Sequence, residues 1–327
     1  VRNKLKNEFN YIKKKIKKAN QIYIIGHKFI DLDAYGAAIG MYYYTINLKK
    51  RSRIILDDTK LESSVKKVIN MFSDKVDIVK SKNIDVVDDK DLLIIVDTNK
   101  QNLISNVKLL SKFNNIIIID HHKVDENTIS NDKTYQFIDT TASSTCEIIT
   151  KQLILENISI NKLISTALLS GIVLDTNNFT LRTNSDTYYC AYYLSRCGAD
   201  SKMVQYILKQ NINEYINIQK VITDVNVIKN VAFSKGLQTQ VYRREELAKI
   251  ADTLLLFNNI EASFVVGKVS GGIGISARSM GKIDVGTILN KFNGGGDIHE
   301  AAAIIEDSSL NKVYSDVVDS IKKIKNS

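Results

Sequence analysis

The sequence has no proline and no tryptophan, and it contains only three cysteines among its 327 residues. These cysteines, Cys146, Cys190 and Cys197, form no CxxC pair, and their odd number cannot complete a disulfide framework. The pattern argues against a disulfide scaffold and against a structural zinc site. We therefore expect a reduced, cytosolic protein.

Long apolar runs are also missing. No segment approaches the roughly 20 apolar residues that a membrane-spanning helix needs, and no secretory signal is visible. The composition, 44% hydrophobic and 25% charged, is ordinary for a globular protein with a sizeable core. The length is enough for two domains.

Positive charge is concentrated at the N-terminus. Residues 1–20 hold eight basic residues and one acidic residue, so this segment carries +7 of the net charge of +9. The rest of the chain is near neutral, which does not favour a surface for binding a DNA duplex. Leu5, Phe9, Ile12 and Ile16 have helical spacing. We expect a basic entry helix over 1–20, either solvated, following an upstream domain, or lying near an anionic membrane.

Apolar strands alternate with helical patterns over residues 21–210. One expected strand ends just before His27, a second covers 53–58, and two more end at Asp97 and at Asp120. Helices are expected over 34–48 and 61–72. Residues 143–207 are mainly helical in pattern. Short, continuous apolar strands that alternate with helices predict a parallel sheet covered on both faces. This segment is the predicted catalytic domain of an α/β fold.

The remaining chain has a different pattern. We expect a linking helix over 211–229 and then a smaller α+β domain over 230–327. In this domain, two alternating segments meet at a Gly-Gly pair and predict a β-hairpin over 261–279. A run of three glycines follows at 294–296. Two lobes with a cleft between them would result.

Acidic and imidazole side chains follow the apolar strands of the first domain. In an open α/β sheet, sites form beyond the carboxyl ends of the strands, so these side chains should meet there. Three of the four histidines in the chain are among them. The residues are His27, Asp31, Asp33, Asp97, Asp120, His121 and His122, with Asp175 after a fourth apolar stretch.

So many carboxylates in one crevice repel one another unless cations compensate them. Carboxylates with a few imidazoles suit Mn²⁺ or Mg²⁺ better than zinc. Two such ions about 3.5–4 Å apart can clamp a phosphoryl group and activate a water. Asp97, alone at its strand end, is the candidate bridge. Each residue also has a plainer interpretation, because Asp at a strand end is often a helix cap and His27 alone could be structural. The complete set favours a metal site.

Four motifs in order give the chain a family resemblance. GHKFIDLDAYGAAIG at 26–40, VDT at 96–98, DHH at 120–122 and GIVLDTNNFTLRT at 171–183 resemble the DHH phosphoesterases. Within that family they are most similar to the catalytic part of the membrane-anchored cyclic-di-AMP phosphodiesterases of the GdpP type. The later stretches SARSMGKIDV and NGGGDIHEAAA resemble the DHH-associated C-terminal domain, which binds substrate.

The resemblance implies roles for the clustered residues. One manganese ion would be held by His27, Asp31 and Asp97. The other would be held by Asp33, Asp97, His121 and Asp175, with Mg²⁺ or another divalent ion as an alternative. Asp120 would orient this site from behind, as carboxylates do for metal-bound imidazoles. His122 would face the substrate phosphate, and Asp97, Asp120 and His122 are the expected catalytic residues.

The resemblance also implies a substrate-binding half in the second domain. Arg278 would meet a phosphate or a base, because its planar fork suits phosphate better than lysine does. Ser276 and the glycines Gly294, Gly295 and Gly296 would bind beside it, with backbone N–H groups close to a phosphate.

Some positions depart from the family pattern. The family usually has proline at the position of Ile30, and His-Arg at the positions of Asn99 and Lys100. Its glycine run usually has four glycines followed by His, whereas three glycines and Asp297 stand here. His299 could take the place of the missing histidine.

The function that the resemblance implies is hydrolysis of cyclic-di-AMP to linear pApA by two-metal activation of water. A nanoRNase or pAp phosphatase that acts on short linear nucleotides is one alternative. A catalytically weak nucleotide-binding sensor is another, and Asp297 motivates it. The resemblance further implies a cytoplasmic catalytic fragment of a membrane-anchored protein with upstream sensor and membrane domains. A homodimer stays an open alternative.

Overall fold

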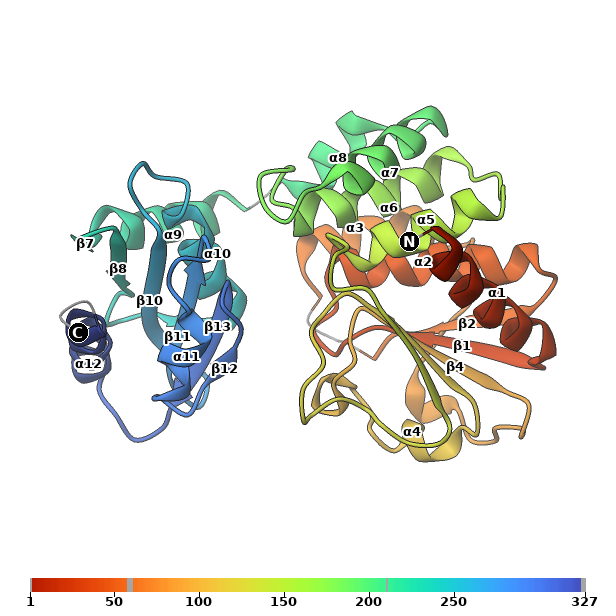
Figure 1. The fold of residues 1–327 in the computed structure, drawn as a ribbon, viewed down its shortest axis with the longest axis horizontal. Coiled ribbons are helices and arrows are strands. Elements are labelled where there is room, and N and C mark those ends of the chain that lie inside the picture. The colour runs from red at the N-terminus through yellow and green to blue at the C-terminus, as the bar shows by residue number, and fades with distance from the viewer. Residues whose placement is uncertain (1, 58–60, 210, 325–327) are drawn as a thin grey trace. The chain divides into compact units, whose positions relative to one another are not determined.

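The computed structural model describes residues 2–57, 61–209 and 211–324 (Figure 1). The chain divides into two compact units, Val1–Lys209 and Gln210–Ser327. Some predicted boundaries lie outside the described residues. They are the domain limits at residues 1, 210 and 327, and the end of the strand predicted over 53–58. Each unit is described by itself.

The first unit is built on a six-stranded sheet in the order β3-β2-β1-β4-β5-β6, and every neighbouring pair is parallel. Strands β4 and β5, which come next to β1 in this order, are buried along their whole length. This confirms the predicted parallel α/β sheet. The strands are β1 (Gln21–Ile25), β2 (Arg51–Ile55), β3 (Ile78–Val79), β4 (Leu92–Val96), β5 (Ile116–Asp120) and β6 (Thr134–Ile138).

Helices cover both faces of this sheet, with most of them on one face and the short α4 on the other (Figure 1). They are α1 (Arg2–Lys18), α2 (Leu32–Asn47), α3 (Ser63–Met71), α4 (Leu109–Lys112), α5 (Thr145–Leu155), α6 (Lys162–Asp175), α7 (Ser185–Arg196) and α8 (Ser201–Leu208). Single turns of 3-10 helix lie at Ser81–Asn83 and Gln101–Leu103. Helix α2 packs against α5 and α6 in the larger core.

Helix α1 is part of the first unit. Phe9, Ile12 and Ile16 are fully buried in its larger core, whereas the lysines of the opposite face are mostly exposed. The ring of Phe9 meets the ring of Phe137 edge-on, with 5.3 Å between centroids. The predicted amphipathic helix therefore forms, and its apolar face packs against the sheet domain rather than remaining apart from it.

The second unit contains a seven-stranded sheet with the order β12-β13-β11-β10-β8-β7, and β9 pairs with β10. Its strands are β7 (Asn226–Ile228), β8 (Val231–Lys235), β9 (Val241–Tyr242), β10 (Ala262–Val269), β11 (Gly272–Ser279), β12 (Gly295–Gly296) and β13 (Glu300–Ile305). Its helices are α9 (Ile212–Thr223), α10 (Arg244–Leu254), α11 (Val285–Asn290) and α12 (Leu310–Ile324).

Most strand pairs in this sheet are antiparallel, as the predicted α+β domain requires. Helices α9 and α10 pack on one face, and α11 and α12 pack on the other. The predicted hairpin is formed by β10 and β11, and its turn includes Gly271 at a φ of 93°, where a glycine is favoured. The linking helix is shorter than the predicted 211–229, because 226–228 form strand β7.

Within the described residues, no helix combines the length and the apolar character that crossing a membrane would need.

The packing of α1 predicts a large effect of one substitution. We expect Phe9→Ala to lower the free energy of unfolding by about 3–5 kcal/mol, because it removes a buried ring and leaves a cavity. Urea denaturation followed by circular dichroism measures this change. Asn10→Ala, on the exposed side of the same helix, should change it by less than about 0.5 kcal/mol. Equal stability of the two variants would mean that α1 is not held in the core.

Candidate metal centre

Three adjacent parallel strands bring the predicted clusters together at the carboxyl end of the sheet. Strands β1, β4 and β5 are neighbours, and their carboxyl ends lie together because they run in the same direction. His27 follows β1 by two residues, Asp97 directly follows β4, and Asp120 is the last residue of β5. Asp175 comes from a helix, as the last residue of α6.

Helix N-termini hold the two aspartates of α2. Asp31 is the N-cap of α2, and its Oδ1 accepts hydrogen bonds from Asp33 N and Ala34 N, both at 2.9 Å. The plainer interpretation, a helix cap, is thus correct for Asp31, which still lies 3.7 Å from His27 Nε2. Fully buried Asp33 accepts from Thr145 N at 2.7 Å and Cys146 N at 2.8 Å, in the first turn of α5. That helix end stabilises negative charge.

Asp97 has an unusual backbone. Its φ is 61°, in the left-handed region that few residues other than glycine, asparagine and aspartate adopt. The two carboxylate oxygens lie near different imidazoles: Oδ2 is 3.6 Å from His27 Nε2, and Oδ1 is 3.4 Å from His121 Nε2. Thr145 Oγ1 also donates to Oδ1 at 3.0 Å. Asp97 is therefore placed between the two halves of the cluster.

Two groups of three residues could each hold one metal ion. Within each group, the candidate ligand atoms lie within 4.8 Å of one another. The first is His27, Asp31 and Asp97, and the second is Asp33, His121 and Asp175. His121 Nε2 lies 3.3 Å from Asp175 and 3.9 Å from Asp33. The grouping agrees with the predicted ligand sets, and their roles as ligands stay predictions.

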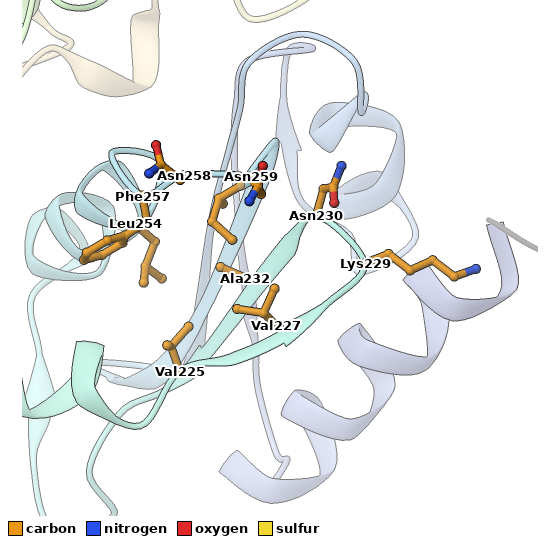
Figure 2. A pocket seen from close by; sticks show the side chains of 10 residues that line it. Val225, Val227, Lys229, Asn230, Ala232, Leu254, Phe257, Asn258 and Asn259 are labelled. Carbon is orange, nitrogen blue, oxygen red and sulfur yellow. The ribbon is translucent and has the colours of Figure 1, made fainter.

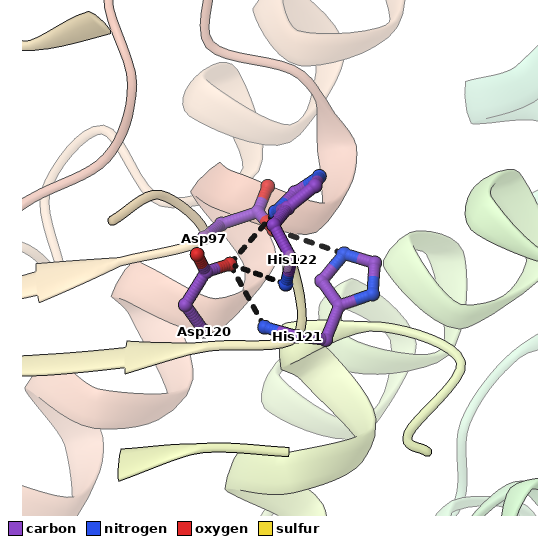
Figure 3. A group of neighbouring side chains, drawn as sticks. All are labelled: Asp97, Asp120, His121 and His122. Carbon is purple, nitrogen blue, oxygen red and sulfur yellow. Dashed lines mark hydrogen bonds and ion pairs between the residues drawn. The ribbon is translucent and has the colours of Figure 1, made fainter. Parts of the chain in front are cut away.

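Asp120 and His122 form a pair beside these groups (Figure 3). Asp120 Oδ1 accepts hydrogen bonds from His121 N at 2.8 Å, His122 N at 3.2 Å and His122 Nδ1 at 2.7 Å. Asp120 thus orients the ring of His122 and holds the backbone of His121, and its expected role behind the second metal stays a prediction. Asp97, Asp120, His121 and His122 also form a third group that could hold a metal.

The carboxyl groups strongly influence one another's protonation. Burial, and then the charges of Asp97 and Asp175, raise the pKa of Asp33 well above its usual value. Burial also raises the pKa of Asp175. Burial opposes ionisation of Asp97 too, but His121 and His27 hold its pKa well below the usual value. The acidic groups of this one cluster therefore differ widely in how readily they ionise.

The donor set fits a divalent cation. His121 Nε2 is buried and makes no hydrogen bond of acceptable geometry to any described residue, although three carboxylates lie within 3.9 Å. A ring nitrogen that faces three carboxylate oxygens suits a cation shared with them. Oxygen-rich ligands with one or two imidazoles favour Mn²⁺ or Mg²⁺ over zinc.

Close packing keeps the ligand-bearing helices together. A Cβ at Gly36 on α2 would lie 2.8 Å from Cys146 Sγ, and a Cβ at Gly171 on α6 would lie 2.4 Å from it. Both positions need glycine because α2, α5 and α6 meet around this sulfur atom. Asp33 and Asp175 are carried on these same helices, so their separation depends on this contact.

Comparisons with known proteins identify two domains in the chain. Residues 21–172 match the model of the DHH family, N-terminal domain, and residues 225–324 match the DHHA1 domain. The chain therefore contains a DHH domain followed by a DHHA1 domain. It is 33% identical over 315 residues to the cyclic-di-AMP phosphodiesterase GdpP of Geobacillus thermodenitrificans, covering 94% of this chain and 48% of that protein.

Two further matches describe the family and the fold. The cyclic-di-AMP phosphodiesterase PdeA of Listeria monocytogenes is 31% identical over 317 residues, which cover 94% of this chain and 48% of that protein. The chain thus spans about half the length of these relatives. The crystal structure of an exopolyphosphatase-related protein from Bacteroides fragilis has the same fold, with a TM-score of 0.82, 19% identity and coverage of 98% of both chains.

In the DHHA1 domain, Arg278 is already paired. Its Nε donates to Asp252 Oδ1 of α10 at 2.7 Å, and Nη2 lies 3.7 Å from Glu300 Oε2 of β13. Ser276, on the same side of β11 two residues earlier, is buried. A substrate phosphate that meets Arg278 would have to share the guanidinium with these carboxylates.

The glycine run is part of the DHHA1 sheet. Gly295 and Gly296 form β12 and pair with β13. A Cβ at Gly294 would lie 2.5 Å from Ala302 O, and one at Gly296, whose φ is 147°, would lie 2.2 Å from Glu300 O. Packing therefore requires glycine at these two positions, and phosphate binding by the run stays a prediction.

Asp297 has a local structural role. Its Oδ1 accepts hydrogen bonds from His299 N at 2.7 Å and Glu300 N at 3.1 Å. These bonds close the turn between β12 and β13. The ring of His299 lies near Ser279 O, with Nδ1 at 3.2 Å.

The sequence interpretation missed two residues of the DHH domain. Thr145 donates to Asp97, and its segment carries the pattern Ser144-x-x-Glu147, a common signature of a helix N-terminus that could have located it. Buried Asn99, treated only as a family departure, donates from Nδ2 to His122 O at 3.0 Å. No sequence signal connects Asn99 with that carbonyl.

The DHHA1 domain also has an apolar hollow of about 440 Å³ (Figure 2). Val225, Val227 and Leu254 are among its walls, and Phe257 lies at its side. The residues that line it, all within the described part of the chain, do not include Ser276, Arg278 or the glycine run.

The shifted pKa values predict how metal binding depends on pH. Neighbouring carboxylates also hold the pKa of His27 and His121 well above the usual value, despite burial. Raised pKa values favour protons on these imidazoles and on Asp33 and Asp175, and any such proton must leave when a cation binds. Mn²⁺ affinity should therefore rise between about pH 6 and about pH 8.

Calorimetry in buffers with different ionisation enthalpies measures the protons released on Mn²⁺ binding. Net release in the lower part of this pH range is the expected result. Equal affinity at both pH values, with no proton released, would contradict the assignment of these buried groups as ligands.

Proposed function

We propose that this chain is the catalytic part of a phosphodiesterase that hydrolyses cyclic-di-AMP to linear pApA with two bound Mn²⁺ ions. The observation that carries the proposal is the position of Asp97, which faces an imidazole from each half of the cluster. The names of the relatives from Geobacillus and Listeria supply the substrate class. Mg²⁺ or another divalent ion could replace manganese in the same oxygen-rich site.

The ligand roles follow from the two groups. His27, Asp31 and Asp97 would hold one ion, and the other would be held by Asp97 together with Asp33, His121 and Asp175. When bound, the two ions would supply positive charge to the phosphoryl oxygens and lower the pKa of a water molecule. Asp97 would neutralise charge on both sides, and the backbone N–H groups of α5 hold Asp33 through two hydrogen bonds.

His122 is the proposed contact with the scissile phosphate. Asp120 accepts the hydrogen bond from Nδ1, so Nε2 is the nitrogen that remains for the substrate. Burial lowers the pKa of His122, but the hydrogen bond to Asp120 raises it above the usual value overall. In its protonated form, the imidazole would attract the anionic phosphodiester. Hydrolysis joins the water oxygen to phosphorus and breaks the bond to the 3′ oxygen, which opens the ring.

The setting of the whole protein belongs to the same proposal. The family resemblance suggests a cytoplasmic catalytic part that is joined to upstream sensor and membrane domains. Its ligand would be a cyclic dinucleotide rather than a DNA duplex, and a homodimer is compatible with this arrangement.

Product analysis tests the proposed reaction. The chain is incubated with Mn²⁺ and, in separate reactions, cyclic-di-AMP, cyclic-di-GMP, pApA and pAp, and the products are separated by chromatography. The expected result is conversion of cyclic-di-AMP to pApA. Turnover of pApA or pAp alone would instead identify an enzyme of short linear nucleotides. Tight cyclic-di-AMP binding without turnover would identify a sensor.

Asp97→Ala should reduce turnover at least about 100-fold and lower the bound manganese, because both ions lose a shared ligand. Steady-state kinetics and metal analysis of the purified protein measure the two effects. Asp77→Ala, which removes the partly exposed partner of Arg53, should change neither. Near-normal activity of Asp97→Ala with two ions retained would rule out the bridging role.

Arg278→Ala should raise KM for cyclic-di-AMP with little change in kcat, because Arg278 is assigned to binding. Loss of a charge-assisted contact corresponds to roughly a 10- to 150-fold increase. Lys282→Ala is the control, because this nearby lysine is largely exposed and pairs with Glu261. A normal KM with a much lower kcat would place Arg278 in the chemistry instead.

A further inference from the structure

A second buried polar cluster lies near the metal centre, and the proposed reaction does not use it. Glu147 on α5 is fully buried. Its Oε2 accepts hydrogen bonds from Ser143 N at 3.1 Å, Ser143 Oγ at 2.6 Å and Thr187 Oγ1 at 2.7 Å. Its Oε1 lies 2.6 Å from Lys151 Nζ, as an ion pair outside hydrogen-bond geometry. A buried charge of this kind is costly unless several partners compensate it.

The cluster joins three segments that are distant in the sequence. Ser143 belongs to the loop that follows β6, Glu147 and Lys151 lie on α5, and Thr187 lies on α7. The buried ammonium of Lys151 also lies 3.2 Å from Asp186 Oδ2 of α7, and 3.9 Å from Asp139 Oδ2 at the start of the loop. The start of α5 is thereby linked to the loop that follows β6 and to helix α7.

The first turn of α5 is the part that contacts the metal centre. Thr145 N and Cys146 N donate to Asp33, and Thr145 Oγ1 donates to Asp97. Glu147 follows in the same turn, and its own N–H donates to the cap Ser144 at 3.1 Å. Of the two groups of three, Asp97 belongs to the one with His27 and Asp33 to the one with His121. One helix turn therefore sets the position of a carboxylate from each group.

We propose that Glu147 and Lys151 are positioning residues that fix the first turn of α5, so that Thr145 and the N–H groups hold Asp33 and Asp97 at cation-binding positions. The inference rests on the proposed function only in that the centre binds divalent cations. It adds residues outside the predicted site. It also gives the ion pair a role beyond the stability of the domain.

The first test is Mn²⁺ binding by Glu147→Gln, measured by calorimetry and by the electron paramagnetic resonance signal of free Mn²⁺. This substitution keeps the shape of the side chain and removes its charge. We expect Mn²⁺ affinity to fall about 10- to 100-fold, the range found when residues that support metal ligands are changed. Unchanged Mn²⁺ affinity would overturn the proposal.

A matched control is available at the other end of the same helix. Glu156 is the C-cap of α5 and pairs with Lys13 and with Tyr44 Oη. Glu156→Gln should lower Tm, as Glu147→Gln does, but leave Mn²⁺ affinity unchanged. If both variants lose affinity in proportion to Tm, the effect is general destabilisation and the proposal fails.

Two more variants separate positioning from stability, and they carry the test if Glu147→Gln does not fold. In Glu147→Gln/Lys151→Met the buried carboxylate and its ammonium are removed together, and only Asp139 and Asp186, whose side chains are partly or largely exposed, lose a cation. Tm should therefore recover in large part while Mn²⁺ affinity stays low. Thr145→Val removes only the hydroxyl that reaches Asp97 and should weaken Mn²⁺ binding at nearly normal Tm. Recovery of both Tm and affinity in the double variant would show a purely structural ion pair.

These measurements need no substrate, so the two proposals can fail separately. A wild-type chain that binds Mn²⁺ but does not cleave cyclic-di-AMP would overturn the proposed function and leave this inference standing. A wild-type chain that binds no Mn²⁺ would overturn both.

Discussion

Repulsion between buried carboxylates is the constraint on which the first unit depends. Asp33, Asp97 and Asp175 converge on His121 within 3.9 Å, where water cannot screen their charges. The protein compensates them with imidazoles and with the N-terminus of α5. The parallel sheet, the close contact of three helices around Cys146 and the left-handed backbone of Asp97 all bring these groups together. Divalent cations are the compensation that the oxygen-rich donor set fits best.

Much of this centre could be predicted because its residues follow a simple rule. His27, Asp97 and Asp120 come at the ends of apolar strands, and a parallel sheet places these carboxyl ends together on the same side. The strands β3 and β6 could not be predicted in the same way. They lie at the sheet edges and lack a buried apolar run. An edge strand has one neighbour and one partly solvated side, so its pattern is weak.

Contacts between residues that are distant in the sequence could not be predicted either. Asp252, Glu300 and Arg278 come from three separate elements, and only the fold shows that they are paired. The glycine run suggested a phosphate loop, but close approach of β13 already explains two of its glycines. Asp297 was interpreted by the histidine it replaces, whereas it closes its own turn. In each case local packing competes with the interpretation that the family motif suggests.

The capping hydrogen bonds of Asp31 and Asp33 have a consequence for the order of assembly. Both carboxylates are already oriented by backbone N–H groups, which come from the starts of α2 and α5. Their direction is therefore set by folding of the chain and does not wait for a metal ion. This distinguishes the centre from small zinc domains, in which the metal drives folding. Ions could then enter, leave and exchange in a cell while the domain stays folded, so occupancy would follow the supply of metal.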